Sequence, residues 1–187
     1  IEVKDEKWRN ALEGYLNSQR FDLIIEPEYF EYALLVYEEY KNKRGIYGVG
    51  IVDVAKMSRY EDVDVKDTLA SQLDCKNTYA RWYANMLLSK VQCVDDVTQL
   101  RNYATAITPT CMLYKNYTAR AINPRIYNKP YIGLGAIKIQ LATIEQELEN
   151  LKQEIKLQKA NYEDLKNGQA LLNQSKADHI FYRLDLI

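Results

Sequence analysis

Apolar and polar residues follow two different patterns along the chain, and the pattern changes at about residue 136. From Ala136 onward, apolar side chains recur at alternating spacings of four and three, the heptad period of a coiled-coil helix. The positions with this period are Ile137, Leu141, Ile144, Leu148, Leu151 and Ile155, continued by Gln158, Tyr162, Leu165, Gln169 and Leu172. The sequence therefore predicts an outgoing coiled-coil arm over 136–187.

The heptad frame changes near Gly168, in the stretch "KNGQ". The next apolar set is out of phase with the first, and consists of Ala177, Ile180, Leu184 and Ile187. Three interpretations stay open: a break in the helix, a stutter, or the turn of a helical hairpin.

Shorter elements are predicted before residue 136. Apolar residues at helical spacing, or β-branched and aromatic runs between turn residues, predict helices over 5–17, 26–45, 78–90 and 95–107, and strands over 20–25, 46–54, 91–94, 108–114 and 117–122. The strand–helix–strand unit over 20–54 has short connections, which predicts parallel neighbouring strands. We expect an α/β (α+β) domain over 18–135, with halves of about 18–67 and 68–135.

A coiled-coil arm has to bury its apolar seam against a second helix. The predicted elements before residue 136 are too short to serve, so we expect the partner to precede Ile1. The chain would then be the tip of an antiparallel coiled coil, and 1–17 would be the end of the incoming strand and the first helix of the domain.

Composition narrows the function classes. The net charge of −1 provides no overall field to attract a polyanion. No apolar run approaches the roughly 20 residues that span a bilayer, and the N-terminus lacks the layout of a signal peptide. The cysteines lie 18 residues apart with a single histidine, which argues against zinc and favours thiols in a reducing cytoplasm. These residues are Cys75, Cys93, Cys111 and His179.

Motifs for catalysis are missing from the sequence. An ATPase needs GxxxxGK[ST], and "GLGAIKIQ" does not fit this pattern. A zinc hook at the tip of a coiled coil would need CxxC. Paired acids such as Glu38 and Glu39, or Asp62 and Asp64, have no His, Lys or Cys constellation beside them. We therefore expect no catalytic site and no cofactor in this chain.

Charge is distributed unevenly. Residues 97–144 contain no Asp or Glu, whereas 26–74 contain eleven acids and six bases. Cations contact phosphates without sequence preference, and tyrosines stack on unpaired bases. The predicted DNA-binding residues are Lys115, Arg120, Arg125, Lys129, Lys138, Tyr117 and Tyr127. The alternative is a solvated basic face with tyrosines in the core and at an interface.

Three stretches resemble the hinge domain of structural-maintenance-of-chromosomes (SMC) ATPases. They are "NALEGYLNSQRFDLIIEPEYFEYALLVYEEYKNKRGIYGVGIVDV", "NMLLSKVQCVDDVTQLRNYA" and "YIGLGAIKIQL". The stretch "ITPTCMLYKNYTARAINPRIYNKPYIG" is more similar to the MukB-like branch, which includes the JetC subunit of Wadjet plasmid-defence complexes. The sequence departs from the family pattern at Asn17, where a glycine is usual, and at its closing stretch, which has only Gly133 and Gly135.

The resemblance implies a homodimer that joins two coiled-coil arms around DNA, as in chromosome segregation by condensin-like complexes. It implies ATP and magnesium at head domains elsewhere in the parent protein, kleisin-type subunits at those heads, and a cytoplasmic, nucleoid-associated location. It also implies close backbone approach between protomers at Tyr131, Ile132, Gly133 and Gly135. The glycines alone are equally typical of a turn and a helix cap. A stand-alone α/β ligand-binding or regulatory domain with a coiled-coil oligomerisation tail is the alternative.

Overall fold

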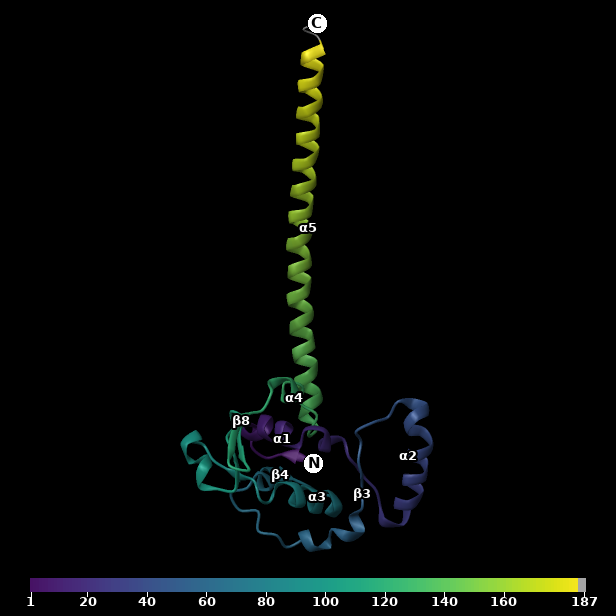
Figure 1. The fold of residues 1–187 in the computed structure, drawn as a ribbon, viewed down its shortest axis with the longest axis vertical. Helices are drawn as coiled ribbons and strands as arrows, with labels where there is room; N and C mark the ends of the chain where they lie inside the picture. Colours follow the sequence, from purple (N-terminus) through teal and green to yellow (C-terminus); the bar gives the residue numbers. More distant parts are fainter. Residues whose placement is uncertain (185–187) are drawn as a thin grey trace. The chain divides into compact units, whose positions relative to one another are not determined.

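The computed structural model describes the backbone of residues 1–184 and the side chains of residues 1–175. Residues Ile1–Gln140 form one compact unit, and a second unit begins at Leu141. The helices are α1 (Arg9–Leu16), α2 (Phe30–Arg44), α3 (Thr78–Leu88), α4 (Pro124–Tyr127) and α5 (Gly135–Leu184) (Figure 1). The strands are β1 (Glu2–Val3), β2 (Leu23–Ile24), β3 (Ile51–Val52), β4 (Leu73–Asp74), β5 (Gln92–Cys93), β6 (Thr105–Ile107), β7 (Met112–Lys115) and β8 (Thr118–Ala121). The predicted fold class, a mixed α/β domain followed by a long helix, is confirmed.

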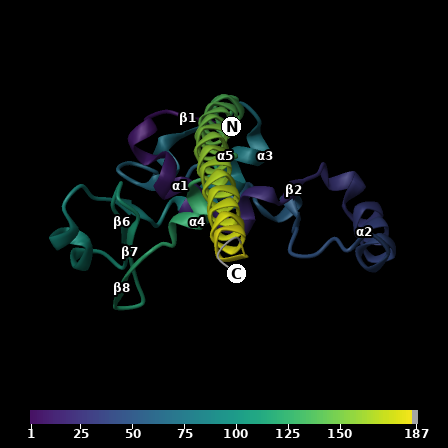
Figure 2. The same ribbon diagram turned by 90° about the horizontal axis from the view of Figure 1, so that it is seen from above.

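The strands of the described residues form three small sheets. Strands β2 and β3 pair in parallel, with Leu23 opposite Ile51 and α2 as the connection, which confirms the predicted strand–helix–strand unit. Strands β1 and β4 pair antiparallel. The third sheet has the order β5-β6-β7-β8, in which only the first pair is parallel. Viewed from above, α2 lies on one flank of the compact unit and β6, β7 and β8 lie on the opposite flank (Figure 2).

The main core of the compact unit surrounds α1. Ala11 and Leu12 are completely buried there, because they lie on the apolar face that the helical spacing predicts. They are joined by apolar side chains from the 3₁₀ turn at Leu69–Gln72, from α3 and from β6, including Leu69, Leu88 and Ile107. The first helix therefore belongs to the compact unit.

The N-terminus differs from the expectation that the first helix continues an incoming coiled-coil strand. Glu2 and Val3 form β1, and a 3₁₀ turn at Glu6–Trp8 leads into α1. The extended backbone of β1 is stabilised by its pairing with β4, so no helix runs through residues 2–5.

The predicted helix over 95–107 is wrong. Asp96 caps a 3₁₀ helix at Val97–Asn102, and Thr105–Ile107 is strand β6. Pairing with strands on both sides, and complete burial of Ala106 and Ile107, outweigh the helical spacing. The predicted strands over 108–114 and 117–122 leave 115–116 as the connection, whereas the observed hairpin turn is one residue later, at Asn116 and Tyr117, which both have positive φ.

Helix α5 continues through Gly168 without a break. A Cβ atom at Gly168 would have no neighbour within 4 Å, so a helix-compatible side chain fits there. The out-of-phase set at 177, 180, 184 and 187 lies outside the described side chains. Within the described residues, no helix has the length and apolarity required to cross a bilayer.

Candidate functional site

The segment immediately before α5 is held by side chains from the first 13 residues. Both carboxylate oxygens of Glu2 accept from the backbone N–H of Leu134, at 3.1 and 3.2 Å. Arg9 donates to the carbonyl oxygen of Ile132 at 2.7 Å. The Oε1 atom of Glu13 accepts from the backbone N–H groups of Tyr131 and Ile132, at 2.6 and 2.7 Å. The N-terminal residues therefore fix the backbone from which α5 begins.

Glu13 is a completely buried carboxylate, and its charge is compensated by Arg20. The Arg20 Nη1 atom lies 2.7 Å from Glu13 Oε2, and the Arg20 guanidinium stacks near the rings of Phe21 and Tyr131. The Nε atom of Arg20 is buried with no hydrogen-bond partner. Removal of one partner of a buried charge pair strongly destabilises the folded protein, because the other charge is left buried without compensation. The Glu13–Arg20 pair consequently links α1, the 3₁₀ turn at Asn17–Phe21 and the segment that precedes α5.

The four residues predicted at a dimer interface lie together in this segment. Ile132 is 8% exposed and belongs to the core. Gly133 has a φ of +83°, a backbone conformation that favours glycine, and a Cβ atom there would lie 2.6 Å from Glu2 Oε2, so the Glu2 carboxylate would have to move. Tyr131 is partly exposed beside Phe21, and Gly135 is the half-buried first residue of α5. An interface role for these residues stays a prediction.

Most of the predicted DNA-binding residues are exposed. Lys115, Tyr117 and Arg120 lie on the β7–β8 hairpin, where Tyr117 at the turn is 94% exposed. Arg125 is on α4, and Lys129 lies 5.8 Å from the ring centroid of Tyr131.

The other two predicted DNA-binding residues lie apart from this hairpin. Tyr127 is half-buried, and its ring lies 3.4 Å from the Cβ position of Gly14, so one face of the ring packs on α1. Lys138 is exposed in the first turn of α5. The predicted DNA-binding cations are therefore distributed over the β7–β8 hairpin, α4, the segment before α5 and the first turn of α5.

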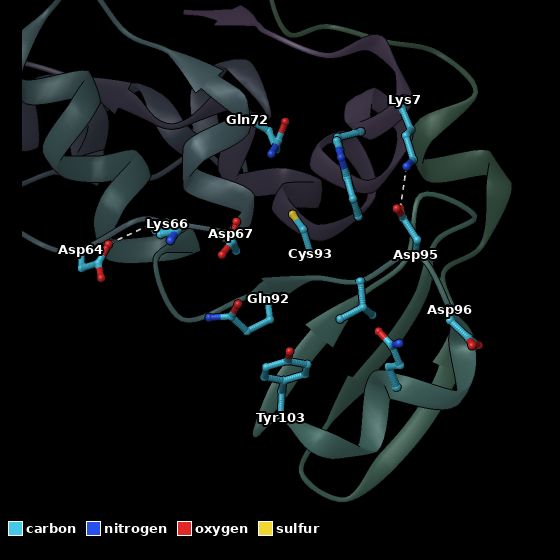
Figure 3. A pocket seen from close by; sticks show the side chains of 13 residues that line it. Lys7, Asp64, Lys66, Asp67, Gln72, Gln92, Cys93, Asp95, Asp96 and Tyr103 are labelled. Carbon is cyan, nitrogen blue, oxygen red and sulfur yellow. Dashed lines mark hydrogen bonds and ion pairs between the residues drawn. The ribbon is translucent and has the colours of Figure 1, made fainter.

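An open cleft of about 810 Å³ lies elsewhere on the compact unit (Figure 3). Lys7 and Asp95 form an ion pair of 2.6 Å across it, and Asp64 accepts from the backbone N–H of Lys66. Burial, with Asp67 nearby, raises the pKa of the Cys93 thiol to about 12, so this thiol is protonated at neutral pH. Among the described residues no group of His, Cys, Asp and Glu could hold a metal ion. The cleft is lined by four aspartates and two lysines, and no nucleophile is paired with a base among these residues.

Apolar side chains concentrate on the first half of the compact unit. Residues 21–47 contain ten exposed large apolar side chains, whereas 48–96 contain none. Helix α2 has no buried residue, although eight of its fifteen residues are apolar. The sequence predicted a helix here, over 26–45, but periodicity could not show that its apolar side chains are left uncovered.

Comparison with known proteins identifies the fold. The chain is similar to a solved structure of the Pyrococcus furiosus Smc hinge domain with an extended coiled coil, with a TM-score of 0.51 and 17% sequence identity. Its fold is that of an SMC hinge domain with a coiled-coil helix. The match covers 95% of this chain and 64% of the Pyrococcus chain, so this chain spans less than two thirds of that structure's length. No family model and no curated protein matches the sequence.

The SMC-hinge similarity agrees with the resemblance stated from the sequence. The Glu13–Arg20 pair and the contacts of Glu2 and Arg9 were not predicted. One signal was available in the sequence, since Arg9 and Glu13 are charged residues on the same side of α1 as Leu12 and Leu16. Charges beside a buried helical face indicate polar contacts to a specific backbone segment.

Proposed function

We propose that the compact unit is the dimerisation hinge of an SMC-like ATPase, and that it joins two coiled-coil arms into a dimer that encloses DNA. The observation that supports this most directly is the SMC-hinge fold continuing into a 50-residue helix. The helix has a heptad seam whose side chains are exposed in the single chain, including Leu148 at 49% and Leu151 at 57%. Such a seam needs a second helix, and we propose that this is the protein's own N-terminal coiled-coil strand.

The hinge itself has no catalytic role in this proposal. ATP and magnesium are bound by head domains of the parent protein, to which kleisin-type subunits attach, and the parent acts on cytoplasmic, nucleoid-associated DNA. Within the SMC proteins we propose that the chain belongs to the MukB-like branch, which includes JetC of the Wadjet plasmid-defence complexes. The basis is the sequence resemblance of residues 107–133 to that branch.

A second proposed role is weak, sequence-independent contact with DNA. It is supported by the cations and the exposed Tyr117 on and beside the β7–β8 hairpin, within a stretch that has no acidic residue. Phosphate contacts by a few cations give weak, salt-sensitive binding, and exposed aromatic rings add affinity for single strands.

Light scattering on two forms of the full chain tests the dimerisation role. The first form is the natural sequence, and the second is the coil variant, Leu148→Glu/Leu151→Glu, in which charges on the seam prevent association through α5. We expect both forms to have twice the chain mass of 21.9 kDa. A dimeric natural chain with a monomeric coil variant would instead favour a ligand-binding or regulatory domain with a coiled-coil oligomerisation tail.

A further inference from the structure

We propose that residues 26–49, the α2 lobe, move as one body on the rest of the compact unit, and that the carboxylate of Asp22 is a latch that fixes the pivot of this movement. The motion is separate from the proposed function, since it takes place within one chain. The contacts of the lobe, its two connecting segments and the hydrogen bonds of Asp22 support it.

The polar contacts of the α2 lobe stay inside it. In the part of the chain that the structure describes, every hydrogen bond, ion pair and cation–ring contact of residues 26–49 joins two residues of the lobe. None of its residues is buried, and α2 lies at the edge of the compact unit in both views (Figures 1 and 2). Segments with few buried contacts move at a low cost in free energy. No polar contact therefore holds the lobe in one orientation.

The lobe has internal contacts that keep its shape. Helix α2 is 15 residues long and ends at Gly45, which has the left-handed conformation. After the helix, the Ile46 N–H donates to the carbonyl oxygen of Lys41 at 2.9 Å, and the Tyr47 hydroxyl donates to Asn42 Oδ1 at 3.1 Å. These bonds tie the return segment to α2. We therefore expect the lobe to move as a rigid body.

The two connecting segments provide the pivot. The outgoing segment has only Ile25 and Glu26 between β2 and the 3₁₀ turn that begins at Pro27. The return segment contains Gly48, which has a φ of +76° and no neighbour within 4 Å of its Cβ position. An unpacked glycine changes its backbone angles at little cost, and the hinges of moving segments are a few loop residues of this kind.

Asp22 holds the chain directly below these pivots. Its Oδ1 atom accepts from the Gly50 N–H at 2.7 Å, and its Oδ2 atom accepts from the hydroxyl of Tyr83 on α3. The Leu23 N–H donates to the carbonyl oxygen of Gly50 at 2.8 Å. A Cβ atom at Gly50 would lie 2.7 Å from Asp22 Oδ1, so glycine permits this close approach. Asp22 therefore ties both ends of the lobe to α3.

The surroundings of Tyr83 keep the latch closed at neutral pH. Burial raises the pKa of Tyr83, and its hydrogen bond to the Asp22 carboxylate raises it further, so the hydroxyl stays protonated and donates. The ring of Tyr83 packs against the apolar cluster of Val52, Val54 and Met57. Strands β2 and β3 thus stay on α3 while the lobe moves. The latch limits the orientations in which the lobe presents its exposed apolar side chains.

Single-molecule Förster transfer in the coil variant at picomolar concentration tests the motion in unassociated chains. Dyes are attached to unnatural amino acids at the exposed positions of Glu31 on α2 and Lys90 after α3. The matched control pair is Lys90 with Arg101, which is also exposed but lies outside the lobe. We expect donor lifetimes that require a range of distances for the first pair and a single distance for the control pair. A single distance for both pairs would overturn the moving lobe.

Asp22→Ala tests the latch with the same dye pair. We expect the range of distances between the dyes to widen, and the Gly50 amide to exchange hydrogen about tenfold faster, as for the loss of one hydrogen bond. Tyr83→Phe keeps the ring and the Asp22–Gly50 bond, so it should widen the range less. The control is Tyr79→Phe, because the Tyr79 ring packs on Trp82 and its hydroxyl has no hydrogen bond among the described residues.

Circular dichroism checks that each variant folds, and Tyr83→Phe alone decides the question if Asp22→Ala does not fold. We expect Tyr79→Phe to leave the range of distances unchanged. A range that Asp22→Ala and Tyr83→Phe also leave unchanged, or that Tyr79→Phe widens as much as they do, would overturn the assignment of Asp22 as the latch.

Discussion

At the scale of single residues, the compact unit depends on a buried carboxylate. Glu13 accepts two backbone hydrogen bonds and forms an ion pair with Arg20, so it links α1 and the 3₁₀ turn after it to residues 131 and 132, which are far away in sequence. Its removal would leave the buried Arg20 without a counter-charge, with only the carbonyl oxygen of residue 13 to accept from it, and would leave two backbone N–H groups without their acceptor. Glu13 therefore contributes strongly to the stability of the segment before α5, beside the contacts of Glu2 and Arg9.

We predict that Glu13→Ala lowers the free energy of unfolding by about 3–5 kcal/mol, the range for one-sided loss of a buried charge pair. Urea unfolding measures this change, and hydrogen exchange at the amides of Tyr131 and Ile132 should become faster in the same variant. Glu39→Ala is the control, because its pair with Lys43 is solvent-exposed on both sides. We expect the control to cost about 0–1 kcal/mol. Equal effects of the two substitutions would refute the special role of Glu13.

At the scale of elements, sequence periodicity predicted the helices well where one face is buried or a cap is present. The helix over 78–90 corresponds to α3, which Asn77 caps, and the helix over 26–45 corresponds to α2. Prediction failed at Thr105–Ile107, because the local sequence has helical spacing whereas pairing with β5 and β7 makes this segment a strand.

The candidate site was predictable in part. A stretch of cations without acids could be found from composition alone, since residues 97–144 contain no Asp or Glu, and most of these cations are exposed in the structure. The contacts of Glu2, Arg9 and Glu13 with residues 131–134 could not be predicted from the sequence, because they join positions more than 100 residues apart.

Gly168 provides a test of the continuity of α5. The glycine lies inside the helix with open space around its Cβ position, so alanine should fit and remove the entropic cost of glycine. We predict that Gly168→Ala stabilises the helix by about 1 kcal/mol and raises its thermal midpoint, followed by circular dichroism. A loss of helicity would instead indicate that residue 168 is the turn of a helical hairpin.

DNA contact is a prediction for the β7–β8 hairpin and its neighbours. Lys115→Gln/Arg125→Gln/Lys129→Gln should reduce DNA affinity and flatten its salt dependence. The natural chain should show a slope of log affinity against log salt of about −2 to −4, for three to five phosphates neutralised. Fluorescence anisotropy across a salt series measures both quantities. The control removes three cations from α5 instead, by Lys152→Gln/Lys156→Gln/Lys159→Gln, and should leave binding unchanged. Equal losses in the two variants would mean that only net charge matters.

At the scale of the whole molecule, the single chain leaves two kinds of apolar surface uncovered. The seam of α5 requires another helix, and the 21–47 surface requires a partner for the compact unit. The dimerisation role proposed above would account for both, because it joins two protomers at the end of their arms. The central claim is therefore that the compact unit associates by itself, independently of the coiled coil.

The most direct measurement of this claim is sedimentation equilibrium of the full-length coil variant over a range of micromolar concentrations. The account predicts a concentration-dependent mass that rises to twice 21.9 kDa, with a dissociation constant of micromolar or tighter. A mass that stays at that of a single chain across the whole range, in a variant whose circular dichroism matches the natural chain, would contradict it.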